Sequence, residues 1–209
     1  MKPCELAPSL ICAAMLVVTG CASRPIVGRY LLSPPASGIV AARTAGDAPR
    51  MRVDPVHVPE FMDSTDILLR QGPGELVTLP TARWGERLSA AFRDALRSDL
   101  RARLPGGAVV DAYTPDPEAR RLAVSVAAFD AWTDGHVVLV ASWTLSEAHP
   151  GRQPAGGQGT FSIPAAGQSK PVADADLVAA MSAAVAALAA QIAQAAASPS
   201  SRDAAVTKQ

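Results

Sequence analysis

Apolar and polar positions alternate in short runs along the chain and recur at helical spacing in two longer segments. Alternation is typical of strands with one buried face, and recurrence every three or four residues is typical of helices. The strand-like runs lie at 30–32, 52–58, 67–69, 76–79, 122–132, 137–145 and 161–163, and the helical patterns at 82–104 and 174–195. This order predicts an α/β (α+β) fold, a two-layer sandwich with a mixed or antiparallel sheet and two helices packed on one face.

Turn residues divide the strand-like runs. Gly72-Pro73-Gly74 and Asp134-Gly135 each stand between two alternating runs, and such residues are typical of hairpin turns. Pro55 has no amide hydrogen, so it predicts an edge or a bulge within its strand. The segments 33–49 and 150–157 are rich in turn-forming residues; the first is predicted to be a loop or an extended cover, and the second a loop.

The first helical pattern repeats an apolar residue every four positions. The stripe comprises Trp84, Leu88, Phe92, Leu96, Leu100 and Leu104. We expect Thr81 to cap the start of this helix and Pro105-Gly106-Gly107 to end it. Because the stripe drifts around the helix, the helix should lie across a twisted sheet.

A basic ridge occupies another face of this helix. Its members are Arg93, Arg97 and Arg101. Asp94 and Asp99 stand at helical spacing from Arg97 and Arg103, which favours a solvated, neutralised face. Anionic headgroups or an acidic partner are the alternative.

The second helical pattern is rich in alanine. Leu177, Met181, Val185, Leu188 and Ile192 form its stripe. A membrane-spanning helix is the alternative to a core helix, because no Lys or Arg lies between residues 170 and 202. The weak hydrophobicity of alanine and the acidic start of the segment favour the core helix.

The first twenty residues are predicted to be a signal peptide. Lys2 precedes an apolar stretch that is too short to span a membrane. The stretch ends in Val18-Thr19-Gly20-Cys21, which resembles the lipobox of bacterial lipoproteins. That resemblance implies cleavage before Cys21, a diacylglycerol on its thiol and an acyl chain on the new amino group. The alternative is an ordinary signal peptide with Cys21 incidental.

Cysteine usage agrees with a lipidated N-terminus. The sequence has three cysteines, at positions 4, 12 and 21, so the mature chain would keep Cys21 alone. An unpaired thiol is unusual in an exported protein unless it is occupied. Ala22 follows it, and lipoproteins of double-membraned bacteria without aspartate there usually reside in the outer membrane. We therefore expect a lipid-anchored domain on the periplasmic face of the outer membrane.

Composition and motifs give no sign of catalysis. Nineteen basic and nineteen acidic residues balance, which argues against nucleic-acid binding. His57, His136 and His149 have no metal-ligand spacing, and no nucleophile motif or phosphate loop is present. The acidic pairs 63/66 and 116/118 and the tryptophans 84, 132 and 143 are interpreted as polar surface and core anchors, respectively. We predict no catalytic, cofactor or metal site, with a lipid-processing hydrolase as the least favoured alternative.

Several sequence blocks in order resemble one family. The blocks are Tyr30-Leu31-Leu32-Ser33-Pro34, Val53-Asp54-Pro55-Val56-His57-Val58-Pro59 with Leu69-Arg70, Arg83-Trp84-Gly85-Glu86-Arg87-Leu88, Phe129-Asp130, Trp143-Thr144-Leu145, and Ala180-Met181-Ser182-Ala183-Ala184 with Leu188-Ala189. Together they are similar to the PqiC/YmbA family of ABC-type transport auxiliary lipoproteins. The family commonly has alanine where Gly85 stands here.

The resemblance implies an α/β sandwich and a non-enzymatic role. It also implies an MCE-domain partner in a lipid transport system of the cell envelope, and assembly into a homo-oligomeric ring. We divide the chain into a signal peptide (1–20), a lipidated tether (21–29), one auxiliary domain (30–197) and a disordered tail (198–209). A structural or secretion-associated lipoprotein that shares only the fold is the alternative.

Overall fold

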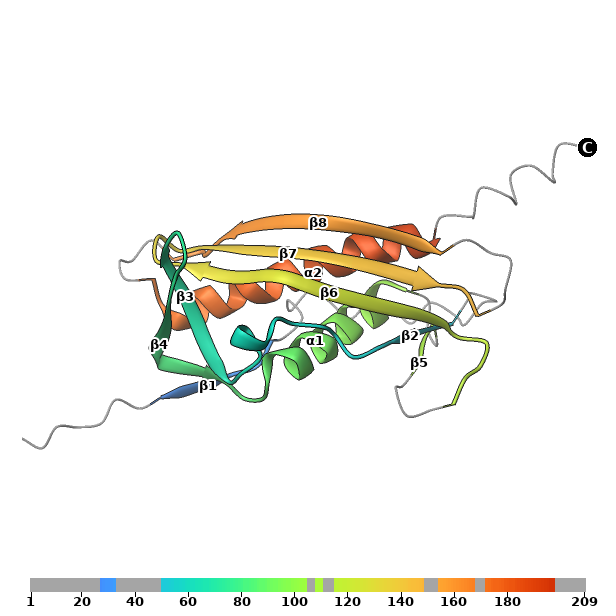
Figure 1. The fold of residues 1–209 in the computed structure, drawn as a ribbon, viewed down its shortest axis with the longest axis horizontal. Coiled ribbons are helices and arrows are strands. Elements are labelled where there is room, and N and C mark those ends of the chain that lie inside the picture. Colours follow the sequence, from blue (N-terminus) through green and yellow to red (C-terminus); the bar gives the residue numbers. More distant parts are fainter. Residues whose placement is uncertain are drawn as a thin grey trace, which may run out of the picture.

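The computed structural model describes residues 27–32, 50–104, 108–110, 115–148, 154–167 and 172–197. These segments form one mixed sheet, two α-helices and a short 3-10 helix (Figure 1). The strands are β1 (Gly28–Tyr30), β2 (Met51–Val53), β3 (Asp66–Gly72), β4 (Glu75–Trp84), β5 (Val109–Val110), β6 (Arg120–Trp132), β7 (His136–Ser146) and β8 (Ala155–Pro164). The helices are η1 (Glu60–Met62), α1 (Leu88–Arg103) and α2 (Asp174–Ala197).

Three long antiparallel strands, β6, β7 and β8, form the main part of the sheet. On the other side of β6, β2 and β3 pair parallel with its two ends, at Val53↔Leu122 and Leu69↔Ala131. The hairpin partner β4 lies beside β3 with β1 beyond it, and β5 pairs with β2. Figure 1 shows α2 behind β6, β7 and β8, with α1 next to it. The predicted two-layer architecture is therefore confirmed.

The core lies between the helices and the inner face of the sheet. Leu139, Ala141 and Trp143 of β7 face it together with every other residue of the neighbouring strands. The predicted stripe of α2 is buried throughout, as are Val53, Val56 and Val58. Phe92 of α1 meets Phe129 of β6 edge to face, with ring centroids 5.5 Å apart. Burial of one face of each layer drives their association.

The first helix starts later than its periodicity predicts. Residues 82–84 belong to β4, where Ala82 and Trp84 pair with Gly28 and Tyr30 of β1, and the helix begins at Leu88. Alternation from Ala82 to Trp84 buries both side chains, and Trp84 matches the helical stripe only by its spacing from Leu88. The prediction that Thr81 caps the helix is wrong, because position 81 lies within a strand.

Strands β2 and β8 also differ from their expected lengths. The run at 52–58 pairs as a strand only over β2 and makes one further bridge, His57↔Ser125, because Pro55 interrupts the ladder. The expected loop at 150–157 is wrong at its end, since β8 begins at Ala155. A Cβ on Gly157 would lie 3.0 Å from the Trp143 ring, so glycine there reflects packing within a strand.

The alanine-rich helix α2 is long and apolar enough to cross a membrane by composition. In the structure it packs against α1, β7 and β8, and most of its apolar window is buried inside the domain. This packing is that of a core helix, as predicted. The predicted signal peptide, Cys21, the loop at 33–49, residues 105–107, His149 and the tail at 198–209 lie outside the described residues.

Candidate functional site

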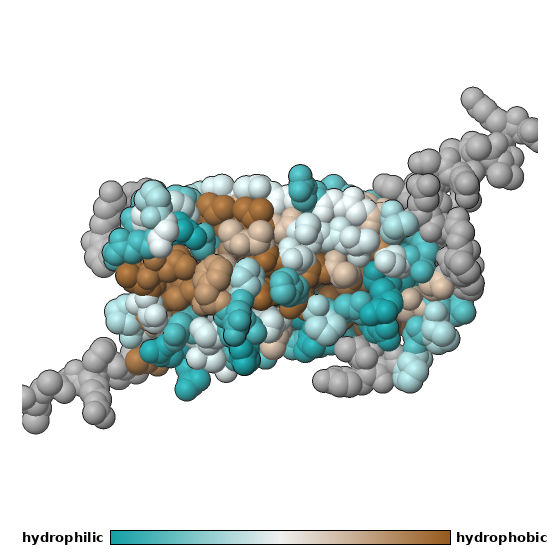
Figure 2. All heavy atoms as spheres, in the orientation of Figure 1, coloured by the Kyte–Doolittle hydropathy of each residue, from teal (hydrophilic) through white to brown (hydrophobic). Residues whose placement is uncertain are grey.

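The outer face of the long strands carries small and uncharged side chains. These include Ala123, Ser125 and Ala127 of β6, Val138, Val140, Ser142 and Thr144 of β7, and Gln158, Thr160 and Ser162 of β8. No helix among the described segments covers this face, and Figure 2 shows a mostly pale to brown surface across its middle. Such a broad, low-charge surface is suited to contact with another molecule.

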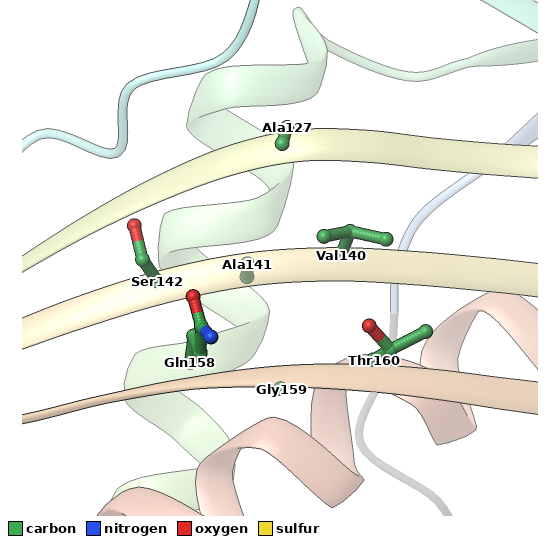
Figure 3. A pocket seen from close by; sticks show the side chains of 7 residues that line it. All are labelled: Ala127, Val140, Ala141, Ser142, Gln158, Gly159 and Thr160. Atoms are coloured by element: carbon green, nitrogen blue, oxygen red, sulfur yellow. The ribbon is translucent and has the colours of Figure 1, made fainter.

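Two adjoining hollows cross this face. The larger, about 570 Å³, is lined by Ala127, Val140, Ser142, Gln158 and Thr160 together with the backbone of β7 and β8. Figure 3 shows the side chains of Ser142, Gln158 and Thr160 standing on the viewer's side of the strands, with the helices behind. The smaller hollow, about 340 Å³, shares Ser142 and extends to the neighbouring part of β6.

Short side chains create these hollows. A β-bulge between Val126 and Ala128 adds Ala127 to β6, so the strand changes the residues that face outward at that point. The bulge also explains why Val126 and Phe129, which are three residues apart, both face the core. Both hollows are open and shallow, so they are better suited to contact with another protein than to enclosing a small molecule.

An aromatic and charged cluster bounds one end of the outer face. Arg70 of β3 lies over the Trp132 ring, 5.7 Å from its centroid, and its Nε is 2.7 Å from Oδ2 of Asp130. The ring of His136 stacks on Trp132 at a centroid distance of 5.0 Å. The imidazole Nδ1 of His136 also contacts the carboxylate of Asp134. The cluster joins β3, β6 and β7 side by side.

Hydrogen bonding lowers the pKa of Asp134, the exposed carboxylate of this cluster. The backbone amide and the ring of His136 bind the Asp134 carboxylate and hold its pKa below the ordinary value, against a slight desolvation. Asp134 therefore remains ionised at neutral pH. The pair presents one carboxylate and one imidazole at the turn between β6 and β7.

The other end of the outer face carries charged side chains. Arg121 binds Asp54 through Nη2 at 2.9 Å. Arg120 faces the helix side of the sheet instead, where it binds Glu147 at 2.9 Å and donates a hydrogen bond to the carbonyl of Ala196 in α2. Arg121 is well exposed, whereas the second pair is largely buried. Charged side chains thus lie at both ends of an uncharged middle, so recognition by charge is restricted to the ends.

The histidines named from the sequence do not meet. His57 is exposed beside the smaller hollow, and His136 lies in the aromatic cluster on β7. Within the described residues, no group of three His, Cys, Asp or Glu side chains could hold a metal ion. The acidic residues 63, 66 and 116 instead bind the arginines 87, 83 and 50, respectively.

The basic ridge of α1 is neutralised as its spacing predicts. Asp94 contacts Arg93 at 3.2 Å and Arg97 at 3.5 Å, and Asp99 contacts Arg103 at 3.1 Å. Burial raises the pKa of Asp99, although the guanidinium of Arg103 opposes the shift. The predicted pairings are therefore present, whereas Asp99 is buried rather than solvated.

Of the three tryptophans, two act as core anchors and one does not. Trp84 and Trp143 are buried, in agreement with the prediction, whereas Trp132 lies half-buried in the cluster described above. The sequence offered a sign of this, because Trp132 is three residues from Phe129 in a strand, and residues three apart in a regular strand face opposite sides.

A remote carboxylate takes the role of the helix cap. Asp63, which follows η1, accepts a hydrogen bond of 3.0 Å from the amide of Ser89 in the first turn of α1. Hydrogen bonds from Ser89 and the charge of Arg87 hold the pKa of Asp63 below its ordinary value, despite partial desolvation. Sequence reasoning missed this cap because it comes from a distant segment rather than from the residue before the helix.

One protein family matches most of this chain. Residues 30–193 match the model of a family described as an ABC-type transport auxiliary lipoprotein component. Among curated proteins, no match is found.

Solved structures with the same fold are also found. A crystal structure of an uncharacterised protein aligns with a TM-score of 0.66 and 19% identity, covering 81% of this chain and 97% of the other. A Xanthomonas campestris protein of the DUF330 family aligns with a TM-score of 0.55 and 20% identity, covering 78% and 91%. At these identities the alignments establish a shared fold.

Proposed function

Since this chain belongs to the family of ABC-type transport auxiliary lipoprotein components, we propose that it is a non-enzymatic docking subunit of an envelope lipid transporter. The observation that carries the proposal is the family match, which spans the domain from β1 to α2. Its partner would be an MCE-domain protein in the periplasm, and ATP hydrolysis elsewhere in the transporter would supply the energy.

The outer sheet face supports a role in contact. It is uncovered by the described helices, uncharged in its middle and hollowed to the depth of small side chains. A surface of this kind binds through shape and apolar contact, with specificity from the charged groups at its ends. We place the MCE-domain contact on this face, with Ser142 near its centre.

The location follows from the N-terminal sequence. Cys21 would carry diacylglycerol and an N-acyl chain, and two or more buried chains give durable anchoring. Only five residues lie between Cys21 and Val27, so a fully extended tether of six residue steps would reach about 20 Å. The domain would therefore stay close to the periplasmic face of the outer membrane. A homo-oligomeric ring of such domains around the partner remains a prediction.

Site-specific photocrosslinking in intact cells tests the docking proposal. A photoreactive amino acid at Ser142 should capture an MCE-domain protein, identified by mass spectrometry. The same amino acid at Ala102, which is exposed on α1, is the matched control and should capture none. Equal capture from both positions, or capture of an unrelated secretion component from Ser142, would overturn the assignment and favour the alternative lipoprotein role.

The anchor is tested separately. Replacement Cys21→Ala should leave a folded domain that fractionates with the soluble periplasmic proteins after detergent-free lysis. Mass spectrometry of the unmodified protein should find the mature N-terminus at residue 21 with fatty acids attached. A Cys21→Ala protein that stays in the membrane fraction would contradict the proposed anchor.

A further inference from the structure

Strand β8 is an unprotected edge. It pairs with β7 over ten consecutive residues without a register shift, and no described strand lies on its other side. Its sequence, Ala155 to Pro164, contains no charged residue. Natural sheets usually protect such edges with charged side chains, bulges or very short strands, because a free edge pairs with other chains. The charge-free sequence and the regular register indicate that another strand pairs with this edge when the protein functions.

The backbone groups on the free side can be identified. The amide of Ala165 donates a hydrogen bond of 2.7 Å to the carbonyl of Gly135, so the odd-numbered residues bond to β7. The carbonyl of Gln158 accepts a hydrogen bond of 3.2 Å from Nε2 of Gln191, so this even-numbered oxygen bonds to a group outside β7. In an antiparallel ladder, alternate residues direct both their amide and carbonyl to the same side. The even-numbered residues therefore face the open side, and these are Gly156, Gln158, Thr160 and Ser162. Pro154 and Pro164 have the same parity and bracket this set.

The free side of β8 can pair with the same side of a second copy, with Gly159 at the centre of the pairing. In an antiparallel pairing of two copies centred on Gly159, residue 156 lies opposite 162 of the other copy and residue 158 opposite 160. The twofold symmetry repeats both pairs, so there are four. Each pair exchanges two backbone hydrogen bonds, about eight in all. Pro154 and Pro164, which have no amide hydrogen to donate, lie opposite each other at the two ends. A shift by two residues would bring a proline against one of the four donors.

Side chains in this register fit as well as the backbone does. On the inner face, Phe161 lies opposite Gly157 of the other copy, and Ile163 lies opposite Ala155. Large side chains thus meet small ones, and Gly159 meets Gly159 at the axis. Opposed aromatic and glycine residues stabilise strand pairs because the ring covers the bare backbone. On the outer face, Gln158 opposes Thr160, so no like charges meet.

The geometry points to a second copy of this chain as the occupant of the edge. Two protomers join β8 to β8 in antiparallel orientation about a twofold axis at Gly159, which makes one continuous sheet of their six long strands. Both outer faces then lie on the same side, because the twofold axis is perpendicular to the sheet. The contact is isologous and closes at two copies, so any ring would need a second interface. This inference goes beyond the docking role and does not depend on it.

Cysteine pairing tests the register in the full mature chain. Pro154 and Pro164 are exposed, and they lie opposite each other across the axis. Two differently tagged chains, Pro154→Cys and Pro164→Cys, are co-expressed and oxidised mildly in membranes. A disulfide dimer carrying both tags should form at least about tenfold faster than dimers of either variant alone, because like positions are about 34 Å apart across the axis. The chain without either substitution reports any disulfide through Cys21, which separates failure of the lipid anchor from failure of this inference.

A substitution at the free amide tests the same contact without crosslinks. Thr160→Pro removes an amide hydrogen that faces the open side and leaves the ladder to β7 intact. In mild detergent the unsubstituted chain and Thr160→Val, which keeps the amide, should have the mass of a dimer, and folded Thr160→Pro that of a monomer. Circular dichroism checks folding. A monomeric unsubstituted chain, equal disulfide rates for mixed and single variants, or another protein bound along β8 would overturn the inference.

Discussion

Removing the carboxylate of Asp130 should destabilise the domain strongly. Its Oδ2 is 2.7 Å from Nε of Arg70, and the two side chains are 8% and 20% exposed. Replacement Asp130→Ala leaves the guanidinium largely desolvated, although it keeps its contact with the Trp132 ring. Breaking a buried ion pair from one side costs about 3–5 kcal/mol. Because Arg70 keeps its contact with the ring, we expect about 3 kcal/mol.

Equilibrium urea unfolding followed by tryptophan fluorescence measures this loss. With a denaturant slope of about 2 kcal/mol/M, the unfolding midpoint should fall by about 1.5 M. Asp54→Ala is the matched control, since it breaks the pair with Arg121, whose side chain is 62% exposed, and the longer pair with Arg52 at 3.7 Å. Exposed pairs contribute about 0–1 kcal/mol, so its midpoint should fall by less than about 0.5 M.

The comparison of the two variants can refute the reasoning. If Asp130→Ala and Asp54→Ala shift the midpoint equally, burial of the Arg70 pair has no energetic weight. The double variant Arg70→Met with Asp130→Leu should recover most of the lost stability, because it removes both buried charges together. A double variant as unstable as Asp130→Ala would show that the loss came from packing rather than from an unpaired charge.

Three further predictions follow from single contacts. Asp63→Ala should lower the free energy of unfolding by about 1 kcal/mol through loss of the cap on Ser89. The lowered pKa of Asp63 in the folded state adds stability above the unfolded pKa, and this contribution disappears as the pH falls through the folded pKa. Asp63→Asn should therefore flatten the loss of stability in acid, which urea unfolding midpoints from pH 7 to pH 3 measure. Gly157→Ala should cost about 1–3 kcal/mol, because the new Cβ would lie 3.0 Å from the Trp143 ring, and thermal unfolding measures it. Phe92→Ala should cost about 3–5 kcal/mol in urea unfolding, and a loss below 1 kcal/mol would contradict its position in the core.

The candidate site was only partly accessible from the sequence. Alternation predicted which residues of β7 face outward, because a regular strand turns every second side chain to one side. It did not predict the hollow at Ala127, which depends on a bulge that only the pairing with β7 reveals. The cluster around Trp132 was missed for a similar reason, since Arg70 is sixty positions from Asp130 in the sequence and meets it only through the parallel pairing of β3 and β6.

The sequence alone determined the layers, the hairpins and α2, because these depend on local periodicity and on turn residues such as Gly135, whose φ of +95° favours glycine. Only the tertiary structure decided where α1 begins, which strand borders the sheet and which carboxylate caps the helix. Trp84 satisfies a helical stripe and a strand equally well by its spacing, and its pairing with Tyr30 settles the choice. The physical reason is that periodicity records which face of a segment is buried, whereas boundaries and edges depend on the partner that buries it.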